Sequence, residues 1–310
     1  MAGIEELMRH ETAGDPITGL KWTRRTTQKI ADELENLSIQ VSANTVARLL
    51  KELGFSLKVN HKKTSSGSPA DRDQQFVYIG ELRDRFASRG QPIVSVDTKK
   101  KELVGNFKNA GQAWSRQPQE VKDHDFRSES DGIAIPYGVY DLQANCGSVF
   151  VGTSHDTPQF AAENLARWWS YQGKRSYPAA NRLLVLADGG GSNGSRTRAW
   201  KHALQGCICD RYGLKLTVCH YPTGASKWNP IEHRLFSEIS KNWAAKPLDS
   251  YQTILNYLSS TTTSTGLQVK SYLVRKTYPK GIKISDLQMS ELNLRKHPTQ
   301  PARNYDLLPR

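Results

Sequence analysis

The stretch LLVLADGGGSNGSR, residues 183–196, passes from an apolar segment into a glycine-rich loop and decides how the fold is interpreted. An unbroken apolar run of this length is typical of a strand buried on both faces of a sheet. Gly189, Gly191 and Gly194 have the G-x-G-x-x-G spacing of a dinucleotide-binding loop. Asp188, at the carboxyl end of the run, is equally typical of a carboxylate that holds a metal ion. The two interpretations predict different proteins.

The segments that follow the loop favour the metal over the dinucleotide. A dinucleotide site needs an acidic residue at the end of the next strand, where it binds the ribose. The next apolar segment, LKLTVCHYP, ends in His220 and Tyr221, and the acid at the right separation, Asp210, precedes it. A carboxylate at position 188 would also face the pyrophosphate with no metal to neutralise the repulsion. We therefore expect no nucleotide cofactor.

Hydrophobic patterning after residue 91 predicts three adjacent strands and then alternating helices and strands. This order is typical of an α/β ribonuclease-H-like fold, in which helices flank a mixed sheet. The expected strands lie at 92–97, at 137–156 (two strands around a turn at Asn145 to Gly147), at 182–188 and at 214–222, and the expected helices at 159–173, 195–213 and 229–243.

The amino-terminal part predicts a separate helical module. Two short helices precede an extended basic segment, FSLKVNHKK, and this order is typical of a winged helix-turn-helix whose second helix enters the major groove. Thr45, Arg48 and Lys51 lie beside or opposite the apolar stripe of that second helix, so they are candidate DNA contacts. An ordinary helical hairpin remains the alternative. The expected segments are 1–20 (amino-terminal), 21–62 (helix-turn-helix-like), 63–90 (linker and helix), 91–247 (catalytic) and 248–310 (carboxyl-terminal accessory).

The charge balance points to a polyanionic partner. The chain has 43 Lys and Arg against 30 Asp and Glu, a formal net charge of +13. Such an excess is typical of nucleic-acid binding, although a solvated basic surface gives the same number. No apolar run reaches the length of a membrane span, and the amino terminus lacks a signal-peptide pattern. We expect a soluble, intracellular protein with no membrane partner.

Three acidic residues have the placement that metal-dependent phosphoryl transfer requires. Asp97 ends the strand IVSVD as Asp188 ends RLLVLAD, and in the expected sheet these strands are neighbours. Glu232 shares an inward stripe with apolar residues of the helix that begins near Asn229, so it can supply a third carboxylate. Asn229, Pro230 and Glu232 also fit a helix capping box, and both roles are compatible.

With these acids in place, the sequence resembles the DDE transposases of the Rhodopirellula-type (ISAzo-like) insertion-sequence family. The resemblance implies a ribonuclease-H-like catalytic domain that cuts and joins double-stranded DNA at element ends and at a target, using two Mg²⁺ ions or Mn²⁺ in their place. By position it assigns the catalytic and metal-binding triad to Asp97, Asp188 and Glu232. It also implies a homo-oligomer on DNA in the bacterial cytoplasm, associated with the nucleoid. The segments that carry the resemblance are VSVDTKKKELVGNFKNAGQAW, HDF, AIPYGVYDL, LADGGGSNGSR, VCHYPTGASKWNPIEHRLFSEISKNW, SYQTILNYLSSTTTSTGLQVKSYL and YPKGIKISD.

Two departures from the family pattern leave alternatives open. Members of the family have further helical sequence upstream, so residues 1–20 are expected to be the remainder of a truncated region, and the ending HPTQPARNYDLLPR lacks an aromatic-rich close. A non-catalytic remnant that occupies element ends is therefore an alternative to the active transposase, and a structure-specific nuclease on the same fold is a third possibility.

Further candidate contacts flank the triad. Lys99 and Lys100 follow Asp97, and Lys227 and Arg234 flank Glu232, so their cations are expected to contact DNA phosphates. A zinc site built from the cysteines near Cys207 is disfavoured, because a C-x-C gap suits structural zinc poorly.

Overall fold

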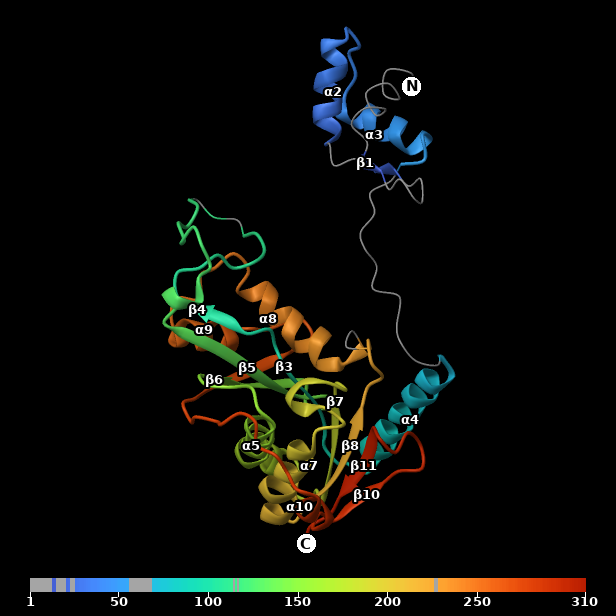
Figure 1. Cartoon of the computed structure of the whole chain (residues 1–310), viewed down its shortest axis with the longest axis vertical. Helices are drawn as coiled ribbons and strands as arrows, with labels where there is room; N and C mark the ends of the chain where they lie inside the picture. Colours follow the sequence, from blue (N-terminus) through green and yellow to red (C-terminus); the bar gives the residue numbers. More distant parts are fainter. Residues whose placement is uncertain are drawn as a thin grey trace. The chain divides into compact units, whose positions relative to one another are not determined.

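The computed structural model describes residues 13–14, 21–22, 26–55, 69–113, 115, 117–225 and 228–310. The chain folds as two compact units, Met1–Thr64 and Ser65–Arg310 (Figure 1). Within the described ranges, no helix combines the length and the apolar character needed to cross a membrane.

The amino-terminal unit contains the two expected helices, α2 (Thr27–Asn36) and α3 (Ala43–Glu52), and a short antiparallel pair, β1 (Ala13–Gly14) with β2 (Lys21–Trp22). Both helices begin at a hydroxyl cap, because Thr26 and Ser42 accept from the N–H groups three residues on, each at 3.2 Å. Their apolar faces meet in a small core of Ile30, Ala31, Leu34 and Val46. The helix pair is confirmed, whereas the wing expected near residues 56–62 lies outside the described residues.

The carboxyl-terminal unit is built on one mixed sheet, as the sequence predicts. From edge to edge the strand order is β10-β11-β8-β7-β3-β5-β6-β9, and β4 pairs with β5. β3, β7 and β8 are parallel, while β5 is antiparallel to both β3 and β6, which is the ribonuclease-H-like arrangement. The strands are β3 (Ile93–Thr98), β4 (Glu102–Val104), β5 (Gly132–Asp141), β6 (Cys146–Gly152), β7 (Arg182–Ala187), β8 (Lys215–His220), β9 (Gln268–Val274), β10 (Leu294–Lys296) and β11 (Asn304–Leu307).

Helices cover both faces of this sheet (Figure 1). On one face, α5 (Pro158–Trp168) and α7 (Arg198–Leu204) pack on the largest apolar cluster. On the other, α8 (Ser237–Asn242) and α9 (Tyr251–Ser259) cover β5 and β6, and α4 (Pro69–Ser88) covers β7 and β8. Successive β7 side chains point to opposite faces, so Leu183 and Val185 join the first cluster while Leu184 and Leu186 pack under α4. Burial on both faces explains the unbroken apolar run.

Four strands of the described unit are absent from the sequence prediction: β4, β9, β10 and β11. β4, β10 and β11 have only 3, 3 and 4 residues, too few to establish a period. β9 alternates exposed and buried residues at its start and pairs in parallel with β6 at the sheet edge. Residues 248–310 thus add strands to both edges of the same sheet.

Candidate catalytic site

Two aspartates leave the sheet side by side. β3 and β7 are parallel neighbours, as expected, and Val96 lies opposite Ala187 in the register. The next residue on each chain is an aspartate, Asp97 or Asp188, so the two carboxylates emerge at the same edge and on the same side. The parallel register therefore produces the acidic pair directly.

A third carboxyl group reaches this pair from a helix. Glu232 begins η6 (Glu232–Phe236), a π-helical turn that continues into α8. Its carboxyl group shares a hydrogen bond with that of Asp97 and interacts electrostatically with Asp188. Single π-helical turns inside helices are frequent at functional sites. Three acidic side chains far apart in the sequence thus gather at one sheet edge.

A buried polar clamp holds the helix against the strands. The Ser95 hydroxyl, fully buried on β3, donates to Asn229 Oδ1 and accepts from the Ile231 N–H at 3.2 Å. Asn229, also fully buried, donates from Nδ2 to Asp188 Oδ1 at 3.3 Å. The clamp therefore connects β3, the end of β7 and the turn that carries Glu232.

The helix begins at Pro230, directly after Asn229, as the sequence predicts, but the side-chain hydrogen bonds of a capping box do not form. The Glu232 N–H bonds the backbone carbonyl of Asn229 at 3.1 Å. The Asn229 amide instead turns towards the buried hydroxyl of Ser95 and the carboxylate of Asp188. A buried polar group is costly without partners, and the sheet offers this amide two of them. Sequence spacing cannot distinguish the two uses of an asparagine.

Asp97 and Asp188 resist ionisation. Burial, and then the charge of Asp188, raise the pKa of Asp97 to about 8, although the Thr98 N–H donates to Asp97 Oδ1 at 2.7 Å and opposes the shift. Burial and the charge of Glu232 raise the pKa of Asp188. Like charges brought together away from water disfavour one another's charged forms. The site is electrostatically unfavourable unless a proton or a cation enters it.

The donor set fits Mg²⁺ or Mn²⁺. Both ions prefer hard carboxylate oxygens, and Mg²⁺ usually takes only a few protein ligands and keeps several waters. As the side chains stand, no group of three or more His, Cys, Asp or Glu in the described ranges has the spacing of a metal centre. The shared hydrogen bond and the raised pKa values show acids that use a proton to offset their repulsion. A divalent cation between them would offset it more fully.

The loop after Asp188 is anchored at one end and open in the middle. Asn193 accepts from the buried Tyr137 hydroxyl at 3.1 Å, and its backbone carbonyl lies 2.8 Å from His220 Nε2. A side chain added at Gly190 or Gly191 would meet no protein atom within 4 Å. Gly191 has a φ of 66°, where glycine is favoured. The anchoring residue Asn193 was not predicted, because its partners lie far away in sequence.

His155 and Asp156 lie after the end of β6 at Gly152, and one of the two side chains reaches the site. Asp156 Oδ1 accepts from the Thr98 hydroxyl at 3.2 Å, next to Asp97. His155 Nδ1 instead lies 3.1 Å from the backbone carbonyl of Tyr278. Asp156 therefore supports the edge of β3, while His155 holds a distant loop.

The lysines and arginines expected to contact DNA beside the triad differ in accessibility. Lys100 and Arg234 are exposed. Lys99 is buried, its ammonium lies 3.2 Å from Glu102 Oε1 and 4.6 Å from the centre of the Trp243 ring, and burial lowers its pKa. A phosphate contact by Lys99 would require this ion pair to open. Lys227 lies outside the described residues.

On α3, the three expected groove contacts sit on the accessible side of the helix. Arg48 and Lys51 are exposed, and Arg48 forms an ion pair with Glu52 at 2.8 Å. An exposed pair of this kind is worth only a few tenths of a kcal/mol, about 0.3–0.5, so it leaves Arg48 free to exchange partners. The Thr45 hydroxyl lies 3.0 Å from that of Ser42 at the start of the helix.

Comparison with known proteins connects this geometry to a family. The family described as Rhodopirellula transposase DDE domain matches residues 3–309. No curated protein matches the chain. Among solved structures, the Mos1 transposase paired-end complex with left transposon end is 17% identical, with a TM-score of 0.46 over 83% of this chain and 69% of that chain. The catalytic domain of Mos1 mariner transposase is 14% identical, with a TM-score of 0.42 over 65% of this chain and 83% of that chain.

Proposed function

Because the chain belongs to the Rhodopirellula transposase DDE-domain family, we propose that Asp97, Asp188 and Glu232 are the catalytic carboxylates with which it cuts and joins DNA at the ends of a mobile element. The observation that carries the proposal is the convergence of these three acids at one sheet edge, where burial and the neighbouring carboxylates raise the pKa values of Asp97 and Asp188. Strongly perturbed pKa values of this kind cluster at functional sites.

The three carboxylates would hold two Mg²⁺ ions, or Mn²⁺ in their place. When bound, the ions would activate the attacking oxygen and stabilise the leaving oxygen of an in-line displacement at phosphorus. In the first step water attacks a phosphodiester at the element end, and the P–O3′ bond breaks to free a 3′-hydroxyl. In the second step that hydroxyl attacks a phosphodiester of the target, a new P–O3′ bond to the element end forms, and the target's own P–O3′ bond breaks to release a target 3′-hydroxyl. No protein–DNA covalent bond forms in either step.

The chain's own residues orient this reaction. Asn229 and Ser95 hold Asp188 and the turn of Glu232 in a fixed relation. The bare backbone at Gly190 and Gly191 lets a DNA strand approach the carboxylates.

Exposed basic residues would bind and position the DNA. Lys100 and Arg234, and Lys227 with them, would contact backbone phosphates beside the carboxylates. Thr45, Arg48 and Lys51 of α3 would read a groove of the element end. Joining two ends requires at least two copies of the chain on DNA.

The test is nicking of DNA from the element's ends by the full chain with and without Mg²⁺. Asp188→Asn should lower the cleavage rate by at least about 10³-fold, because metal stabilisation of developing charge is worth several kcal/mol. Asp123→Asn removes an exposed carboxylate outside the site and serves as the matched control, with cleavage unchanged. Equal cleavage by Asp188→Asn and wild type would overturn the assignment.

The products distinguish the remaining alternatives. A transposase yields both nicked ends and joined products. A structure-specific nuclease yields nicks without joining, and a non-catalytic remnant shifts terminal DNA in a gel without cutting it under any metal.

A further inference from the structure

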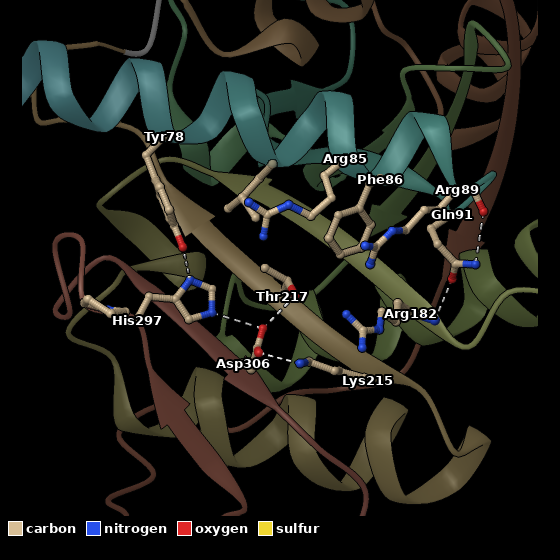
Figure 2. A pocket seen from close by; sticks show the side chains of 12 residues that line it. Tyr78, Arg85, Phe86, Arg89, Gln91, Arg182, Lys215, Thr217, His297 and Asp306 are labelled. Carbon is tan, nitrogen blue, oxygen red and sulfur yellow. Dashed lines mark hydrogen bonds and ion pairs between the residues drawn. The ribbon is translucent and has the colours of Figure 1, made fainter.

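A second polar site lies between α4 and the strands β8 and β11. A cavity of about 180 Å³ opens there (Figure 2). The helix contributes cations from above and the sheet contributes them from below. The basic side chains that line it are Arg85, Arg89, Arg182, Lys215 and His297.

One carboxylate in the cavity is already fully engaged. Asp306 accepts from Lys215 Nζ at 2.6 Å and from the Thr217 hydroxyl at 2.7 Å, and it lies 3.1 Å from His297 Nε2. These donors, and His297 first among them, hold the pKa of Asp306 far below its usual range against the opposing effect of burial. The negative charge of Asp306 is therefore neutralised within the protein.

Three guanidinium groups have no such acceptor. Arg85 reaches into the cavity from the last turn of α4, Arg89 from the residue after that helix, and Arg182 from the start of β7 (Figure 2). Across the described part of the chain, no hydrogen-bond acceptor or carboxylate pairs with any of these three side chains. Like charges gathered around one cavity repel, and an anion among them would reverse the sign of that interaction.

A favourable helix terminus explains only part of this cluster. Arg85 lies in the last turn of α4 and Arg89 follows it, where cations benefit from the helix dipole. That effect does not account for Arg182, which comes from the start of β7. Lys215 of β8 also lines the cavity, but its charge is paired with Asp306. The unpaired cations therefore come from the end of a helix and from a strand.

The rim is held in place by Gln91. The side-chain oxygen Oε1 of Gln91 accepts from the backbone N–H groups of Asn181 at 3.2 Å and Arg182 at 2.9 Å. The backbone carbonyl of Gln91 accepts from Gln143 Nε2 at 2.7 Å. One side chain thus fixes the start of β7 against the turn between α4 and β3. The backbone that presents Arg182 is organised before any ligand arrives.

We infer that this cavity binds a phosphate group. Guanidinium groups match the geometry of phosphate oxygens and bond them two at a time. Pockets that enclose drug-sized ligands measure roughly 300–1,000 Å³, so a cavity of 180 Å³ takes a phosphate and leaves a sugar and base outside. The phosphate can come from a nucleic-acid backbone or from a free phosphate ion.

This site is separate from the carboxylate edge. Arg182 begins β7 and Asp188 follows its end, so about six residues of strand, or about 20 Å, lie between them. The inference does not depend on the catalytic role of the three acids.

The experiment compares Arg89→Gln/Arg182→Gln with a double variant of equal charge change, Lys174→Gln/Arg175→Gln, whose side chains are exposed on α6 (Lys174–Ser176) away from the cavity. One arm titrates inorganic phosphate against the full chain and follows binding by calorimetry and by the rise in melting temperature. The other arm measures binding of a mixed-sequence duplex across a range of salt concentrations. Arg89→Gln alone, an exposed rim substitution, stands in if the double variant does not fold.

The inference predicts a loss of binding in the cavity variant that the control does not share. If the source is free phosphate, its affinity falls by at least about tenfold. If the source is a DNA backbone, the slope of log K against log salt becomes shallower by about 0.9 for each phosphate that the variant no longer neutralises. Unchanged phosphate binding together with an unchanged salt slope, relative to Lys174→Gln/Arg175→Gln, would overturn it.

Discussion

The two ends of strand β7 carry opposite charges. At its carboxyl end, Asp188 meets Asp97 and Glu232, and burial together with the neighbouring charges raises the pKa values of Asp97 and Asp188. At its amino end, Arg182 faces Arg85 and Arg89 across a cavity whose single acid is already paired. Between them the strand is apolar and buried on both faces.

The comparison shows how one strand can keep an acidic cluster and a basic cluster apart. A buried β-strand in the middle of a sheet cannot tolerate charges along its length, so they collect where it ends. Like charges gather at each end. Bound cations would stabilise the acids at the carboxyl end, and a bound anion would stabilise the arginines at the amino end. The function proposed above involves both, since DNA is a polyanion and the proposed chemistry uses divalent ions.

The largest effect should follow from damage to the shared strand. Leu184, fully buried in the centre of β7 beneath α4, contributes to both ends alike. Leu184→Ala should lower the free energy of unfolding by about 2–5 kcal/mol and weaken both sites together. Urea unfolding measures this, with the exposed Leu287→Ala on α10 (Asp286–Ser290) as a control that changes stability by less than about 0.5 kcal/mol. Loss of binding at one end alone would show that the two ends are not coupled through the strand.

A change at the clamp should affect the carboxyl end alone. Asn229→Ala leaves the buried Ser95 hydroxyl without its acceptor, at about 1–3 kcal/mol of stability. Loss of the support for Asp188 should lower Mg²⁺-dependent cleavage by about 10- to 100-fold. Phosphate binding at the amino end should stay at the wild-type value. Asn256→Ala, on an exposed position of α9, is the matched control; equal cleavage by the two variants would remove the positioning role of Asn229.

The two ends should also respond to pH in opposite directions. The folded protein raises the pKa of Asp97 to about 8, so without metal it keeps a proton that the unfolded chain releases above about pH 4. The contribution of this residue to the free energy of unfolding therefore falls as pH rises from about 4 to about 8. Asp97→Asn should become more stable relative to wild type over that range. Asp306, whose pKa is lowered, contributes stability that is complete above about pH 4 and is lost in acid.

Denaturant midpoints across this pH range, in a metal chelator and then with Mg²⁺, measure the effect. Added Mg²⁺ should restore wild-type stability at high pH and leave Asp97→Asn nearly unchanged. A pH profile that is the same for the two proteins in chelator would contradict the raised pKa.

The smallest effect concerns the cations in the absence of a ligand. Arg182→Gln should leave stability unchanged or raise it by up to about 0.5 kcal/mol in low-salt, phosphate-free buffer, because it relieves repulsion among exposed or partly exposed cations. Added phosphate should raise the free energy of unfolding of this variant by less than it raises that of wild type. A clear loss of stability without phosphate would mean that Arg182 serves the fold and not a ligand.

The sequence predicts what depends on local pattern. Periodicity predicts the apolar run before Asp188, the amphipathic helices and the order of elements along the chain, β-β-β-α-β-α-β-α. The structure confirms them, with the short β4 as an addition. The adjacency of β3 and β7 follows from the fold class, so the proximity of Asp97 and Asp188 could be expected as well.

Long-range partners and very short elements could not be predicted. The Ser95–Asn229 bond joins residues 134 positions apart, and the local spacing around Asn229 pointed instead to a cap. Lys99 follows Asp97 in a basic run, yet the strand turns it inward to Glu102 and Trp243. The phosphate cavity combines a helix end, two strand starts and β11, an element of four residues without a readable period.

We propose that the three carboxylates gather to hold divalent ions. Crystals of the full chain grown with Mn²⁺ would show whether they do, because anomalous scattering locates that ion without assumptions. We expect Mn²⁺ coordinated by Asp97, Asp188 and Glu232, with paired ions about 4 Å apart when DNA is bound. Well-ordered carboxylates with no Mn²⁺ between them, at a concentration that supports cleavage, would contradict it.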